Sequence, residues 1–313
     1  MLKYILTRIL TTVPIMAVVA LFVFSLLYIT PGDPAAVIAG DQATPADIDR
    51  VREALNLNEP YLIRFATWVG QVVTGDLGRS IFTNLPVATV IGQRIGPTLS
   101  LMAVTIILAV LTAVPLGVLA AWKAGKLADR LVLLLSVLGF SIPVFIVGYL
   151  VTYIFAVKLG WLPLQGYTPI SEGIWPWLRK LILPALALSL AYIALLARIT
   201  RSAMLEVLAN NFVKAARAKG VGPGAILFIH ALKNAAVPVV TIIGTGIGLL
   251  IGGAVVTETV FAIPGLGRLT VDAILQRDYP VIQGIVLLFS FLYVLINLMV
   301  DIIYAMLDPR IRY

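Results

Sequence analysis

Five ionisable residues lie in or next to long apolar segments of this chain: Glu258, Arg268, Asp272, Asp278 and Asp301. Charged side chains are energetically costly within a membrane, so such residues are candidates for contacts with a polar substrate. Glu258 and Asp278 lie near segment ends, where water reaches them, and Asp301 is close enough to an end to pair structurally with a lysine or arginine. A zwitterionic substrate suits a passage that carries both signs of charge. Glu258 with Arg268 is therefore the first pair to test.

Several kinds of chemistry are excluded by residue usage. The chain has no cysteine and a single histidine, His230, so a thiolate site, a disulfide and a multi-histidine metal centre are all impossible. An intramembrane protease needs a serine with a histidine, or paired aspartates, at one depth, and Asp301 has no acidic companion within a span. The phosphate-binding pattern GxxxxGK[ST] is absent from the sequence. We expect no enzymatic activity, no bound cofactor and no metal in this chain.

The composition is that of a membrane protein. Hydrophobic residues make up 60% of the 313 positions, and the mean hydropathy is +1.03. A helix needs about 20 apolar residues to cross a bilayer. Six segments meet this requirement, so we expect an all-α membrane protein with six transmembrane helices, the first of which is retained rather than cleaved as a signal. The expected spans are 9–30, 98–122, 131–157, 181–200, 236–257 and 282–307.

The distribution of charge predicts the orientation of the chain. With the N-terminus in the cytoplasm, the cytoplasmic segments hold 13 basic and 3 acidic residues, whereas the outer segments hold 10 basic and 11 acidic residues. Positive charge is retained on the cytoplasmic side, so both termini are expected there. The net charge of +8 follows from this topology and requires no nucleic acid partner.

We expect two regions: residues 1–97, with the first span and an extracytoplasmic segment, and residues 98–313, a five-span core. The stretch TPADIDRVREALNLNEP predicts a short amphipathic helix that begins after Thr44, with Pro45 at its first position. Pro264 and Gly265 predict a break after the fifth span. Pro115 and Pro143 predict kinks in the second and third spans.

Gly244, Gly248 and Gly252 recur every fourth residue in the fifth span and form one smooth stripe on a helix. Small residues at this spacing allow helices to approach closely. The stripe indicates packing within the subunit, a subunit interface or a translocation path.

The longest cytoplasmic segment, residues 201–235, contains the stretch KAARAKG at 214–220. Phe212, Ala215, Ala216 and Lys219 fall on one flat helical face, while Lys214, Arg217 and Ala218 point elsewhere. Gly220 predicts the end of this helix, and AILFIHALKNA predicts a second helix after a sharp turn. The flat face suits docking into a groove, although a positive-inside loop that happens to be helical gives the same pattern.

This stretch resembles the EAA loop found in permease subunits of bacterial ATP-binding-cassette (ABC) importers. Ala215, Ala216, Gly220 and Leu232 match the pattern, whereas Lys214, His230 and Lys233 replace its Glu, Ile and Pro. Further stretches look like the dipeptide and oligopeptide branch of that family, which includes nickel and glutathione permeases. They are PGDP at 31–34, GDLGRS at 75–80, TETVFAIPGLGRL, VDAILQRDYPV and the terminal LDPRIRY.

The resemblance implies a type I ABC importer permease in the bacterial cytoplasmic membrane that translocates di- or oligopeptides. It implies pairing with a second six-span permease, two ATP-binding subunits that use ATP and Mg²⁺, and an extracytoplasmic substrate-binding protein. Nickel, glutathione and a sugar-like conjugate are alternative cargoes, and an ion-driven secondary transporter is the alternative class. The resemblance assigns docking on the ATP-binding subunits to Phe212, Lys214, Ala215, Ala216, Arg217, Lys219 and Gly220.

Overall fold

The computed structural model describes residues 2–29, 33–40, 43–54 and 57–307. Part of the PGDP stretch, Leu55 of the predicted amphipathic helix and the end of the LDPRIRY stretch therefore lie outside the described residues.

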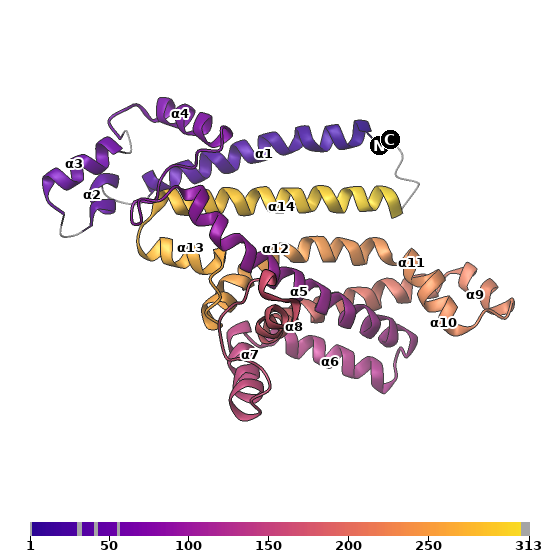
Figure 1. The fold of residues 1–313 in the computed structure, drawn as a ribbon. Coiled ribbons are helices and arrows are strands. Elements are labelled where there is room, and N and C mark those ends of the chain that lie inside the picture. Colours follow the sequence, from indigo (N-terminus) through magenta and orange to yellow (C-terminus); the bar gives the residue numbers. More distant parts are fainter. Residues whose placement is uncertain (1, 30–32, 41–42, 55–56, 308–313) are drawn as a thin grey trace.

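Within the described residues, five helices are each long and apolar enough to cross a membrane. Because lipid offers no hydrogen-bond partners, a helix is the form in which a single segment satisfies its own backbone groups. The helices are α1 (Leu2–Ile29), α5 (Val87–Trp122), α8 (Ile174–Leu208), α12 (Ala236–Val260) and α14 (Tyr279–Leu307). In Figure 1, α1, α14 and α12 lie side by side, with α5 and α8 on the far side of α12 from α1. These helices confirm five of the predicted spans.

The third predicted span, 131–157, is not a single helix. It consists of α6 (Leu127–Ser141), α7 (Val144–Val151) and the π-helical segment η1 (Thr152–Lys158), with a bend of 104° between α6 and the segment that follows. Pro143 lacks a backbone N–H and holds Ile142 in an extended conformation, with φ −92° and ψ 120°. The kink expected at Pro143 is confirmed, but the straight crossing expected for 131–157 is corrected to a bent pair of helices. By contrast, α5 continues through Pro115.

The two ends of the bundle carry different short elements. At one end lie α2 (Pro34–Ala39), α3 (Pro45–Ala54), α4 (Tyr61–Val73) and α13 (Leu266–Leu275). At the other lie α9 (Asn211–Ala218), α10 (Pro223–Ala225) and α11 (Leu232–Asn234), together with the start of α1 and the end of α14 (Figure 1). The start of α1 and the end of α14 thus lie at the same end of the bundle as α9, and the assignment of that side to the cytoplasm stays a prediction.

The helix predicted after Thr44 is confirmed as α3. The Thr44 hydroxyl donates to Asp47 at 2.6 Å, and the Asp47 N–H donates back to the Thr44 hydroxyl at 3.3 Å. This reciprocal pairing satisfies backbone groups at the start of the helix. The sequence analysis did not anticipate α2 or α4.

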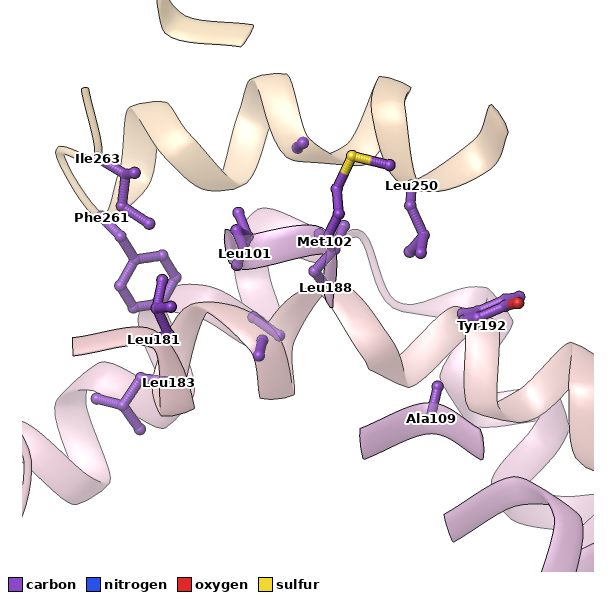
Figure 2. Packing of buried hydrophobic residues seen from close by; sticks show 13 residues of the cluster. Leu101, Met102, Ala109, Leu181, Leu183, Leu188, Tyr192, Leu250, Phe261 and Ile263 are labelled. Atoms are coloured by element: carbon purple, nitrogen blue, oxygen red, sulfur yellow. The ribbon is translucent and has the colours of Figure 1, made fainter. Parts of the chain in front are cut away.

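The main core lies where α5 and α8 pack against each other and against α12. Figure 2 shows Leu101 and Met102 of α5 between α8 and α12, with Leu181 and Leu188 of α8 beside them. Phe261 and Ile263, in the break after α12, close the same cluster. This core fixes the central three helices relative to one another.

Small residues allow the close helix crossings. A Cβ added to Gly117 of α5 would lie 2.7 Å from the carbonyl oxygen of Ala197 in α8. In the predicted glycine stripe, a Cβ at Gly244 would lie 2.1 Å from Val300 of α14, and one at Gly248 would lie 3.0 Å from Tyr293. A Cβ at Gly252 would meet nothing within 4 Å. Two members of the stripe therefore pack within the subunit, and Gly252 faces open space.

Gly117→Ala should lower the free energy of unfolding by about 1–3 kcal/mol, because its Cβ meets a backbone carbonyl that cannot rotate away. Gly252→Ala is the matched control, and should leave stability unchanged or raise it by up to ~1 kcal/mol. Unfolding of both variants in the same detergent measures the difference. Equal melting temperatures would contradict the close crossing of α5 and α8.

Candidate functional site

Helix α9 is attached to the bundle by one side and by the segment that follows it. Val213 is 1% exposed, while its neighbours on α9 are more accessible. After α10, the π-helical segment η3 (Ile226–Ala231) places Leu227 and Ala231 in a buried cluster with Val118 of α5 and Met204 of α8. The segment that follows α9 therefore packs against the ends of α5 and α8.

The flat face predicted for this helix is accessible. Phe212, Ala215 and Lys219 are exposed, and Ala216 is half-buried. Lys214 and Arg217 are also exposed, on another side of the helix. The face singled out from the sequence thus lies away from the buried Val213 and is open to a partner.

Gly220 ends the helix as predicted. Its φ is +79°, a left-handed conformation that side chains disfavour. The N–H of Gly220 donates to the carbonyl of Arg217 at 3.0 Å, and that of Val221 donates to the carbonyl of Ala216 at 3.1 Å. These bonds satisfy carbonyls at the helix end and turn the chain sharply toward α10.

An ion pair between a buried aspartate and a half-buried arginine supports the same end of the bundle. Arg201 of α8 donates to both oxygens of Asp129 in the first turn of α6, at 2.5 and 2.8 Å. The backbone N–H of Gly125 donates to the same carboxylate at 2.9 Å. Sequence reasoning missed this contact, although Asp129 is the one acid in the basic stretch KAGKLADR. The pair joins α6 and the turn before it to the start of the loop that carries α9.

Glu258, at the end of α12, is fully buried. Its carboxylate accepts the Thr98 hydroxyl of α5 at 2.6 Å and the backbone N–H of Arg268 at 3.0 Å. The Thr98 hydroxyl in turn accepts the N–H of Leu266 at 2.7 Å. The carboxylate therefore caps the N-terminus of α13 and fastens it to α5. The predicted pair of Glu258 and Arg268 is therefore in contact, but the contact is made by the backbone N–H of Arg268.

Asp278 holds the opposite end of α13. It is 3% exposed and accepts the Ser80 hydroxyl at 2.5 Å and the N–H of Ile81 at 3.2 Å. Two stretches that carried the family resemblance, GDLGRS and VDAILQRDYPV, thus meet in space. Asp278 joins the segment before α5 to the junction of α13 and α14.

The remaining charged candidates occupy different places. Asp301 of α14 pairs with Arg8 of α1 at 3.1 Å, as the structural reading of this residue anticipated. Arg268 and Asp272 of α13 are half-buried. In the described ranges, no group of three or more His, Asp or Glu side chains is arranged to hold a metal ion.

Long apolar helices, with a packed helical loop exposed at one end of the bundle, define a multi-pass membrane protein. Residues 113–313 match the family described as "Binding-protein-dependent transport system inner membrane component", and residues 1–102 match its N-terminal companion. The chain belongs to this family. It is the permease subunit of an ABC importer and not its ATPase, and the resemblance found in the sequence is confirmed.

Named relatives match along the full length of the chain. The chain is 53% identical over 310 residues to a probable peptide ABC transporter permease of Sinorhizobium fredii, covering 99% of both chains. It is 39% identical to a dipeptide transport system permease of Alkalihalophilus pseudofirmus and 44% identical to a glutathione transport system permease of Salmonella paratyphi A, covering 100% of each chain.

The fold is also that of a solved ABC transporter. An inward-facing structure of the MetNI methionine ABC transporter matches with a TM-score of 0.58 and 20% identity, covering 70% of this chain and 96% of that one. At this identity the likeness concerns the fold alone, which confirms the expected permease architecture.

Thr98→Val should loosen α13, because the isosteric side chain removes one donor to Glu258 and the acceptor for Leu266 N–H. A lost buried hydrogen bond of this kind costs about 1–3 kcal/mol. Hydrogen exchange of the α13 amides should accelerate in Thr98→Val and stay near the wild-type rate in Thr98→Ser, which keeps the hydroxyl. Equal exchange in the two variants would show that the Glu258 cap does not hold α13.

Proposed function

We propose that this chain translocates peptides, paired with a second permease and driven by two ATP-binding subunits that use ATP and Mg²⁺. An extracytoplasmic binding protein delivers the cargo. Peptide, dipeptide and glutathione permeases among the full-length relatives support this class of cargo, since glutathione is itself a small peptide.

The observation that carries the coupling part of the proposal is the exposed flat face of α9. Ala215 has no bulk beyond Cβ and is exposed beside Phe212, so a groove on a partner can approach the helix closely. Lys219 on this face, with Lys214 and Arg217 on another side of the helix, makes α9 positively charged, which favours an acidic docking surface on the ATP-binding subunit.

A docked helix can transmit movement only if it is fixed to the spans. Helix α9 contacts η3, and the cluster around Leu227 and Met204 binds η3 to α5 and α8. The pair of Asp129 with Arg201 joins α6 to α8. A displacement of α9 by the ATP-binding subunit is therefore passed to three membrane helices together.

Among the charged residues first considered for cargo contact, Arg268 and Asp272 are the ones left accessible on α13. Glu258 and Asp278 are buried in hydrogen bonds to the chain itself, and Asp301 is paired with Arg8. We therefore assign cargo contact to Arg268 and Asp272, and a holding role to the other three. The stripe residue Gly252, which faces open space, is assigned to the interface with the second permease or to the passage.

Ala216→Glu should reduce substrate-stimulated ATPase activity and uptake by at least tenfold, because a carboxylate would be buried without a partner when α9 docks. Ala218→Glu, the same change on another side of the helix, is the control and should retain most activity. Both variants should assemble at comparable levels in the membrane. Equal activity of the two would contradict docking through the flat face.

The cargo class is tested by purifying the complete transporter and measuring ATP hydrolysis with its binding protein and a panel of dipeptides, longer peptides, glutathione and Ni²⁺. Stimulation by peptides is the expected result. Stimulation by Ni²⁺ alone, or transport driven by an ion gradient without ATP, would contradict the proposal.

A further inference from the structure

A cavity of about 460 Å³ lies at the end of the bundle that carries α3 and α4. It is bounded by α1, α4, the start of α14 and residues 77–84. Two arginines, Arg64 and Arg79, and one carboxylate, Glu59, are the charged residues of its lining, and Phe24 and Trp68 supply an apolar wall. The lining is therefore net positive. The cavity is separate from α9, but it adjoins the Asp278 contacts at the end of α13, because Ser80 and Ile81 belong to its lining.

Arg64 is the distinctive residue of this cavity, because it is 7% exposed. Its guanidinium donates to the hydroxyl of Tyr28, and lies 5.3 Å from the ring of Tyr28 and 5.8 Å from that of Phe24. Across the described part of the chain, no carboxylate forms an ion pair with it. Burial lowers the pKa of Arg64, which is the signature of a desolvated cation.

The hydrogen-bonding capacity of Arg64 exceeds what the protein supplies. A guanidinium carries five N–H donors in a planar fork and stays charged at neutral pH. One neutral hydroxyl and two ring faces satisfy only part of that capacity. A buried charge is ordinarily paired, so this cavity offers an anion a charged partner that the described residues leave unpaired.

The surroundings of α4 indicate where that anion comes from. Leu62, Ile63 and Val73 of α4 are 75%, 55% and 80% exposed, although α4 is not one of the spans. The opposite side of the helix carries Tyr61 and Trp68, which contact Phe24 of α1. Exposed apolar residues beside tyrosine and tryptophan are typical of the membrane–water interface, which is the depth of the lipid phosphates.

We propose that this cavity is a phosphate-binding site in which Arg64 holds a single phosphate group, carried by a phospholipid headgroup or present as free phosphate. The planar fork matches two phosphate oxygens, which a lysine ammonium cannot do. Arg79, whose guanidinium donates to the carbonyl of Asn84 at 3.2 Å, adds a second positive charge to the lining.

The site is tested on the complete transporter, purified and stripped of lipid in detergent. Dioleoyl phosphatidylglycerol, inorganic phosphate and a dipeptide are added separately to the wild type, Arg64→Gln, Arg64→Lys and Arg50→Gln. Arg50 is the matched control, because it is an exposed arginine of α3 at the same end of the bundle. Retained lipid is counted by native mass spectrometry, and binding is followed by the rise in melting temperature.

The wild type and Arg50→Gln should bind the phospholipid alike, with at least tenfold weaker binding in both Arg64 variants. The same pattern with inorganic phosphate but not with the lipid would identify free phosphate as the source. Binding of both that is indifferent to Arg64 would overturn the proposal, as would a response to the dipeptide alone. If the Arg64 variants do not assemble, a wild type that neither retains phospholipid nor responds to phosphate would overturn it equally.

Discussion

The end of this permease that carries α13 depends on the buried carboxylate of Glu258. The chain must leave the helix α12 and start α13 without stranding backbone N–H groups in an apolar setting, where each unsatisfied group is costly. Glu258 accepts the N–H of Arg268, and Thr98 accepts that of Leu266 while donating to Glu258. Gly265 and Gly267 make room for the carboxylate, since a Cβ at either position would lie within 3.0 Å of its oxygens. One acidic residue therefore joins α12, α13 and α5.

The two ends of the bundle are held by different kinds of contact. At one end, Glu258 and Asp278 hold α13 through polar contacts to residues far away in the sequence. At the other end, an apolar cluster and the pair of Asp129 with Arg201 fix the loop that carries α9. The core of α5, α8 and α12 connects the two. These different contacts fit the proposal that a binding protein docks at one end and ATP-binding subunits dock at the other.

The features predicted correctly from the sequence are those that depend on neighbouring residues in the chain. The apolar lengths predicted the long helices, and Gly220 predicted the end of α9. Sequence reasoning placed a kink at Pro143, but the 104° bend depends on packing that no local signal specifies. Glu258 and Asp278 were treated as cargo candidates because their partners, Thr98 and Ser80, lie 160 and 198 residues away. An acid near an apolar segment indicates importance, and only the fold distinguishes a cap from a binding residue.

The central claim is that the flat face of α9 is covered by an ATP-binding subunit, and the natural absence of cysteine allows a direct measurement. Single variants Ala215→Cys and Ala218→Cys are labelled with a thiol reagent, once in the complete transporter and once in the permease pair alone. The account predicts that the ATP-binding subunits slow labelling of Ala215→Cys at least tenfold and leave Ala218→Cys much less affected. Equal labelling of Ala215→Cys with and without those subunits would contradict it.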